Sequence, residues 1–117
     1  MSYRVVYHTE VRAERSQLPA NERVAMNNAV EKLELFGPDL PAPHQSNVEG
    51  ARNLRELRPR AGRSPWRALY RRVTADTFVI AAIAPDAEVS RRRFNQAARL
   101  PLARLDGIEL PNEERNA

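Results

Sequence analysis

The pattern of hydrophobic and polar residues divides the chain into candidate helices and strands. Between residues 22 and 36, apolar residues recur at intervals of three and four, at Met26, Ala29, Val30, Leu33 and Phe36. This spacing predicts an amphipathic helix with one apolar face. Asn21 is available as its N-cap, and Gly37-Pro38 ends it. A shorter polar helix is expected over residues 10–17, so that the two helices form a hairpin.

Four segments have the composition of strands. Residues 3–8 (YRVVYH) are rich in β-branched and aromatic residues, which predicts a short opening strand. Later in the chain, three segments are expected to form a meander of antiparallel strands, at residues 52–58, 65–73 and 78–84. The last of these, FVIAAIA, is almost continuously apolar, which is typical of a strand buried on both faces.

The remaining segments are expected to be a loop, a helix and a tail. Residues 37–51 lack periodicity and contain three prolines, which indicates a long loop. A last helix is expected to begin at Pro85-Asp86, with Asp86 as its N-cap and a kink or break at Pro101. Residues 107–117 form a polar tail. The order β-α-α-β-β-β-α predicts a single α+β domain over residues 1–106, with an antiparallel sheet against a helical hairpin and a C-terminal helix.

Composition limits the classes of function that fit this domain. The 117 residues are 42% hydrophobic and 29% charged, as in an ordinary folded domain. No apolar run approaches the roughly 20 residues that span a bilayer, and the first residues do not resemble a signal peptide, so a cytoplasmic location is expected. The absence of cysteine excludes disulfides, thiolate metal sites and cysteine nucleophiles.

Positive charge is concentrated in one segment. Residues 51–72 carry eight arginines against one acidic residue, whereas residues 1–50 and 73–117 each carry a small net negative charge. A local basic patch suits a polyanion, with nucleic acid as the commonest partner and an acidic protein as the next. The clustering is more informative than the residue type, because eighteen of the nineteen basic residues are arginine.

Side chains alternate between the two faces of a strand, which groups the arginines of residues 65–73. Arg67 and Arg71 share a face and lie four residues, or about 13 Å, apart along a strand, so their long side chains are expected to clamp one phosphate or two adjacent ones. The alternative is an exposed face with solvated or acid-paired arginines. Arg55 and Arg58 have opposite parity on the preceding strand, so they face opposite ways unless a bulge or the strand end intervenes.

Other chemistry finds little support. His8 and His44 are the only histidines, and neither belongs to a spacing typical of a metal site. The glycine motifs of nucleotide-binding proteins and serine hydrolases are absent. Arg91, Arg92 and Arg93 are either a second basic patch or the solvated first turn of the last helix. No cofactor or metal is therefore expected.

Several segments together resemble the RelE/ParE toxin superfamily, and specifically its phage-derived HigB-like branch. The resemblance covers residues 3–100 and rests on LFGPDL with the following PH, on LRELR and on WRALY. It implies the toxin of a type II toxin-antitoxin system, with a helix-turn-helix antitoxin as partner. Many such toxins are metal-independent endoribonucleases that cut mRNA on the ribosome, where cations stabilise the pentavalent transition state.

The same resemblance assigns roles to individual residues. Arg58 and Arg67 match basic positions of the motif and Tyr70 its aromatic position, so these three are the catalytic candidates. Arg55 and Arg71 are expected to support them as phosphate-binding residues, and Arg91 and Arg92 are further candidates for binding RNA.

One departure from the family pattern keeps other functions open. This branch usually carries a basic stretch of the kind HGFxKK after the last strand, whereas residues 82–88 read AIAPDAE. Loss of one transition-state donor can cost about 10²- to 10³-fold in rate. The alternatives are a catalytically reduced member that binds nucleic acid or an acidic antitoxin segment without cutting, and a ParE-like poison of DNA gyrase.

Overall fold

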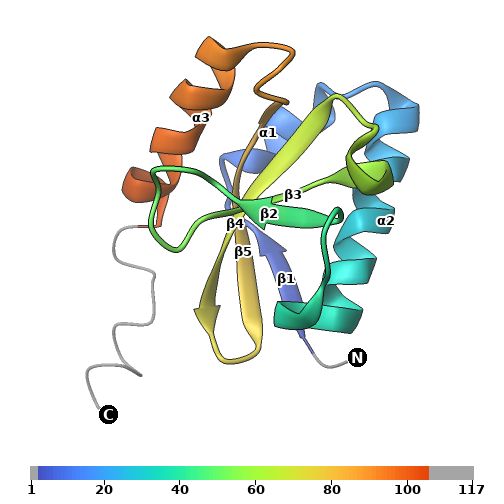
Figure 1. Ribbon diagram of the computed structural model, residues 1–117, viewed down its shortest axis with the longest axis vertical. Coiled ribbons are helices and arrows are strands. Elements are labelled where there is room, and N and C mark those ends of the chain that lie inside the picture. The colour runs from blue at the N-terminus through green and yellow to red at the C-terminus, as the bar shows by residue number, and fades with distance from the viewer. Residues whose placement is uncertain (1–2, 106–117) are drawn as a thin grey trace.

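The computed structural model describes residues 3–105, which form a five-stranded sheet with helices on both faces (Figure 1). In chain order its elements are β1 (Arg4–Tyr7), α1 (Val11–Ser16), α2 (Ala20–Phe36), β2 (Gln45–Asn47), β3 (Arg55–Leu57), β4 (Trp66–Thr74), β5 (Thr77–Pro85) and α3 (Arg91–Arg104), with 3-10 turns η1 (Gly37–Asp39) and η2 (Pro59–Gly62). The predicted α+β class and element order are confirmed, with one added strand, β2. The expected tail at residues 107–117 lies outside the described residues.

The sheet is mixed, in the order β1-β5-β4-β3-β2. β4 pairs antiparallel with β3 and β5, as the predicted meander requires, but β1 runs parallel to β5. The expectation of a fully antiparallel sheet was therefore wrong. β4 pairs with only one edge of β5. The other edge of β5 pairs with β1, which provides hydrogen-bond partners for Thr77–Ile80.

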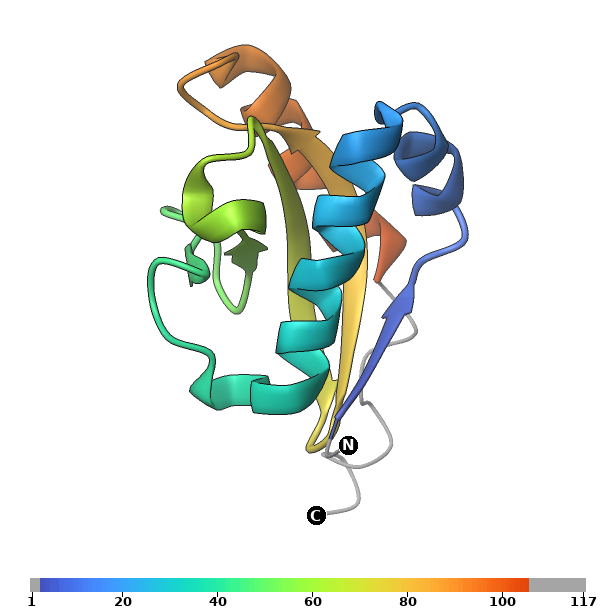
Figure 2. The same ribbon diagram turned by 90° about the vertical axis from the view of Figure 1, so that its right-hand side faces the viewer.

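Hydrophobic cores lie on both faces of the sheet. In Figure 2, α2 packs along one face, and the core there includes Met26 and Leu33 of α2 with Tyr70 and Ile80 of the sheet. On the opposite face, Phe94 and Ala97 of α3 join Leu69 of β4 in a second core. β5 is buried from Phe78 to Pro85, which confirms the prediction for FVIAAIA. Strand β4 is buried on both faces from Arg67 to Tyr70, whereas Arg71 is half-buried and Arg72 is exposed.

The predicted loop over residues 37–51 contains a short strand that its composition did not indicate. Gln45 pairs with Leu57 and Asn47 with Arg55, so β2 supplies hydrogen bonds to the outer edge of β3. Three polar residues have no strand pattern of their own, and this strand exists because the neighbouring edge needs partners.

Two predicted helix starts were wrong. Helix α2 begins at Ala20 with Pro19 as the N-cap, in place of Asn21. Helix α3 begins at Arg91, where the Ser90 hydroxyl accepts a hydrogen bond from the Arg93 backbone N–H at 3.2 Å. Ser90 is one of the strongest N-cap residue types, and it leaves the side chain of Asp86 free for another partner.

Helix α3 also continues through Pro101 without the predicted break. The proline lies within the last turn, so only one interior hydrogen bond is lost, and burial of Pro101 and Leu105 holds that turn against the sheet. Among residues 3–105 there is no helix with the length and apolarity needed to cross a membrane.

Candidate functional site: an arginine-lined cleft

A cleft of about 470 Å³ brings together three arginines that are distant in the sequence. Arg58 follows β3, Arg67 lies on β4 and Arg91 begins α3. Four carboxylates line the same cleft, from Glu49, Glu56, Asp86 and Glu88. The structure thus unites Arg58 and Arg67, whose relative placement the parity of the strands left open. Their positive charge is matched by the carboxylates around them.

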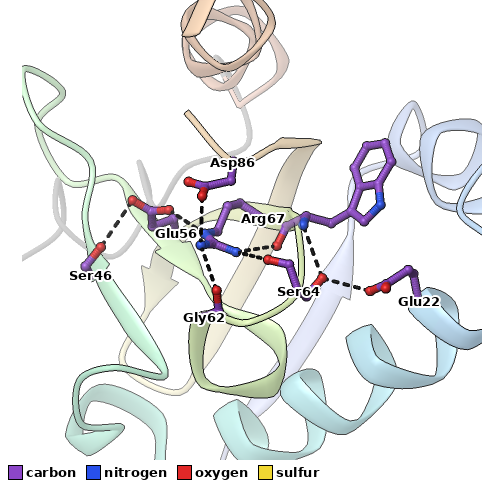
Figure 3. Close-up of polar contacts among 8 residues, drawn as sticks. Glu22, Ser46, Glu56, Gly62, Ser64, Arg67 and Asp86 are labelled. Atoms are coloured by element: carbon purple, nitrogen blue, oxygen red, sulfur yellow. Dashed lines mark hydrogen bonds and ion pairs between the residues drawn. The ribbon is translucent and has the colours of Figure 1, made fainter. Parts of the chain in front are cut away.

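Arg67 is enclosed by acceptors from several segments (Figure 3). Its side chain is 1% exposed, with Nε 3.1 Å from a Glu56 carboxylate oxygen and Nη2 3.3 Å from one of Asp86. It also donates hydrogen bonds to three backbone carbonyls, those of Gly62, Ser64 and Trp66. Burial lowers the pKa of Arg67, although the Asp86 carboxylate opposes this. A guanidinium remains charged at neutral pH, so Arg67 is a buried cation neutralised by the protein itself.

Asp86 belongs to residues 82–88, the segment that lacks the basic stretch expected from the resemblance. Its backbone carbonyl accepts hydrogen bonds from the backbone N–H groups of Val89 and Ser90, at 2.9 and 3.0 Å, in the turn that precedes α3. This turn directs the carboxylate of Asp86 towards Arg67. The Asp86 carboxylate therefore compensates part of the charge of Arg67.

Arg58 lies between β3 and η2 and lines the cleft. Its side chain is half-buried, and no ion pair with a carboxylate joins it within residues 3–105. Its Nε atom is buried and has no hydrogen-bond partner. A Cβ at Gly62, where φ is +96°, would lie 3.0 Å from Arg58 Nη2, so this glycine allows the guanidinium to pack closely. Arg91 is exposed at the mouth of the cleft.

Glu22 anchors the loop that joins Arg58 to Arg67. Its carboxylate is buried and accepts hydrogen bonds from the Ser64 hydroxyl at 2.8 Å and from Arg60 Nη1 at 2.9 Å. The Ser64 hydroxyl in turn accepts from the Trp66 N–H at 3.1 Å. Because α2 supplies Glu22, the helix fixes the loop geometry on which the position of Arg67 depends.

Sequence reasoning missed Glu22, Glu56, Ser64 and Asp86. One signal was available for Glu22, because it lies four residues before Met26 and so shares the apolar face of the helix. A charged residue on such a face requires a buried partner. The other three residues lie in segments whose contacts become known only from the fold.

Acid titration is expected to reveal the Glu22 contact. Burial alone raises the pKa of Glu22, but hydrogen bonds from Arg60 and Ser64 and the charge of Arg60 outweigh it and lower the pKa. A carboxylate with a lowered pKa in the folded state adds stability that is present above about pH 4.3 and is lost as pH falls through the folded-state value. Glu22→Gln should therefore lower the unfolding free energy by about 1–3 kcal/mol at pH 7.

Urea unfolding of both proteins between neutral and acid pH checks this expectation. The difference between wild type and Glu22→Gln should shrink below about pH 4. Glu31→Gln, at an exposed position of the same helix, is the matched control and should leave stability unchanged. A difference that stays constant across this pH range would show that the Glu22 charge contributes nothing.

The remaining predicted site residues lie elsewhere. Tyr70, Arg55 and Arg71 line a second hollow of about 190 Å³, and Arg92 is exposed on α3 and lines neither space. Arg67 and Arg71 share a strand face but line different hollows, so they form no common phosphate clamp in this structure. Tyr70 is buried, and burial raises its pKa to about 12 despite the nearby charge of Arg55. A phenol with this pKa is protonated at neutral pH.

The described part of the chain contains no cluster of side chains suited to binding a metal ion. No group of three or more His, Asp or Glu side chains there is arranged to hold a metal ion. The carboxylates of the cleft have other partners: Glu56 contacts Arg67 and Ser46, and Asp86 contacts Arg67. The chemistry available in the cleft is that of guanidinium groups and carboxylates.

Comparison with solved structures places the fold among known toxins. Similar structures include the archaeal RelE-RelB complex from Pyrococcus horikoshii OT3, with 24% identity and a TM-score of 0.54 over 73% of this chain and 96% of that chain. A free mutant of the E. coli toxin RelE has 17% identity and a TM-score of 0.60 over 85% and 97%. Isolated E. coli RelE has 13% identity and a TM-score of 0.57 over 80% and 97%. The fold is RelE-like.

Sequence comparison identifies the family. No curated protein matches the chain significantly. The family model described as "Phage derived protein Gp49-like (DUF891)" matches residues 13–83, from α1 to the middle of β5, and includes Arg58 and Arg67. The chain therefore belongs to the phage-derived Gp49-like family and has the RelE-like fold.

Proposed function

We propose that this chain is a toxin of a type II toxin-antitoxin system, of the HigB-like branch, that inhibits translation by cutting mRNA on the ribosome without a metal. The observation that carries this proposal is the cleft, in which Arg58, Arg67 and Arg91 meet on a RelE-like fold. The solved RelE-RelB complex supports an antitoxin as partner, for which we propose a helix-turn-helix protein.

The proposed reaction is attack of a ribose 2′-oxygen on the adjacent phosphorus. The bond from phosphorus to the 5′-oxygen breaks, and the leaving 5′-oxygen takes a proton from water. This leaves a 2′,3′-cyclic phosphate on one product and a 5′-hydroxyl on the other. Charge on the phosphoryl oxygens increases in the transition state, so Arg58 and Arg91 stabilise it more than the ground state. A carboxylate of the cleft, such as Glu56, is a suitable acceptor for the 2′-hydroxyl proton.

Arg67 has a positioning role in this scheme. It contacts Glu56 and Asp86 and is too enclosed to reach a phosphate as placed. Tyr70 has no assigned role, because it packs in the core on the α2 face of the sheet.

Induced expression in a bacterial host tests the proposed function. Growth should stop, transcripts should carry new 2′,3′-cyclic phosphate ends within their coding regions, and co-expression of the protein encoded beside this one should restore growth. Growth arrest with intact transcripts and trapped gyrase-DNA breaks would move the assignment to a gyrase poison.

A second candidate function is a non-cutting member of the same fold. It is favoured by the charge balance of the cleft, where three arginines face four carboxylates and Arg67 is already paired with two of them. On this alternative the protein binds RNA, DNA or an acidic antitoxin segment and has no toxicity. Salt-sensitive binding without growth arrest or cut transcripts would favour it.

A further inference from the structure

The excess positive charge of the chain lies outside the cleft. A second surface, which we name the basic groove, consists of Arg52, Arg55, Arg71, Arg72 and Arg99. It joins the hollow of about 190 Å³ to another of about 480 Å³, and Arg71 and Asn53 line both. Of the residues that the structure describes, no aspartate or glutamate lines either hollow. The groove and the cleft therefore differ sharply in charge.

Unequal strand lengths create this groove. β3 begins at Arg55, which pairs with Tyr70, whereas β4 continues to Thr74. The edge of β4 beyond Tyr70 is consequently not covered by β3. The preceding turn contains Asn53, whose φ of +59° lets the chain reverse beside this open edge. Arg71 and Arg72 follow Tyr70 on the uncovered part of the strand.

Neutral acceptors hold three of these arginines in place. Arg55 Nη1 donates to the side-chain oxygen of Gln45 at 2.8 Å. Arg71 Nε donates to the carbonyl of Asn53 at 3.1 Å, and Arg72 Nε to that of Ala75 at 3.1 Å. None of the three forms an ion pair with a carboxylate within residues 3–105. Each guanidinium keeps further N–H donors, so these arginines can still donate to an anion.

We propose that the basic groove binds the phosphodiester backbone of single-stranded RNA independently of the cleft. This inference rests on RNA as the target in the proposed function. A guanidinium offers a planar fork that matches a phosphate, and five arginines over adjoining hollows suit a chain of repeated charges. The hollow beside Arg55 is smaller than the roughly 300 Å³ of a drug-sized pocket, which suits a phosphate with part of its ribose.

Binding of a labelled oligouridylate of about ten nucleotides, followed by fluorescence anisotropy, tests this proposal. The probe carries 2′-O-methyl groups, so 2′-hydroxyl chemistry cannot consume it. The triple variant Arg55→Gln/Arg71→Gln/Arg72→Gln of the full chain should bind at least about tenfold more weakly, and its slope of log affinity against log salt should fall by about 2, for three lost phosphate contacts.

Two controls separate the groove from general charge and from the cleft. Arg4→Gln/Arg12→Gln/Arg93→Gln removes the same charge at exposed positions outside both sites and should bind nearly as the wild type does. Arg58→Gln/Arg91→Gln changes only the cleft and should retain most of the RNA affinity. Thermal unfolding by circular dichroism confirms that each variant is folded.

Distinct outcomes would overturn the proposal. Equal weakening by the two triple variants would show diffuse attraction, and wild-type affinity in the groove variant would exclude this surface. If oligoglutamate of equal length binds the groove more tightly than the RNA probe, its occupant is an acidic peptide. Loss of cleavage in the cleft variant with RNA binding retained would support both proposals. RNA binding by a wild-type protein that cuts no RNA would support the basic groove and contradict the proposed function.

Discussion

Arg67→Met is expected to lower the free energy of unfolding by about 3–5 kcal/mol. The substitution removes a buried cation and leaves the carboxylates of Glu56 and Asp86 without their partner. It also leaves the carbonyls of Gly62, Ser64 and Trp66 without a donor that the native structure provides. Methionine fills much of the same volume, so the loss reports the polar contacts more than a cavity. Chemical denaturation of the purified proteins measures it.

A compensated variant serves as the control for this prediction. Adding Glu56→Gln and Asp86→Asn to Arg67→Met removes the two carboxylate charges that have lost their partner. This should restore part of the lost unfolding free energy, because uncompensated buried charge causes most of the destabilisation. Stability of Arg67→Met close to that of the wild type would contradict the enclosed arrangement of Arg67 and would return this residue to the phosphate-facing role that the family resemblance predicted.

Arg58→Gln is expected to reduce the rate of RNA cleavage by about 10²- to 10³-fold and to abolish growth arrest. Arg58 lines the cleft and has no carboxylate partner in the described part of the chain, so its guanidinium is available to a phosphate. Single-turnover cleavage of ribosome-bound mRNA measures the rate. The unfolding free energy should change little, since few contacts of the fold depend on this side chain.

Arg63→Gln is the matched control for Arg58→Gln. Arg63 is exposed in the same connection between β3 and β4 but does not line the cleft. It carries the same charge, so its replacement should leave cleavage near the wild-type rate. Equal activity of Arg58→Gln and wild type would contradict the assignment of Arg58, and equal loss in both variants would show that only the overall charge of the loop matters.

Local sequence patterns predicted most of the fold because most elements have a clear periodicity. The spacing from Met26 to Leu33 identified α2, and the apolar run FVIAAIA identified β5. The pattern did not reveal β2 or the parallel direction of β1, because both follow from the free edges of neighbouring strands. Helix starts were misplaced where two capping residues lie close together, as with Asp86 and Ser90.

The candidate site was predicted less completely. Alternation along β4 placed Arg67 on the face of Leu69, but it could not show that the Arg67 side chain is buried, because it does not reveal that both faces of β4 are covered from Arg67 to Tyr70. The partners of Arg67 come from β3 and from the turn after β5, so their approach depends on the register of the whole sheet. The sequence also could not show which arginines lie near the carboxylates of the cleft and which lie in the basic groove, because this depends on the tertiary structure.

The most direct measurement is cleavage of mRNA by the purified protein on translating ribosomes, in a buffer that contains the magnesium required by the ribosome and no other added metal. The proposed function predicts cuts that depend on the ribosome, products with 2′,3′-cyclic phosphate and 5′-hydroxyl ends, and loss of both with Arg58→Gln. Full-length mRNA after incubation with excess wild-type protein would contradict it.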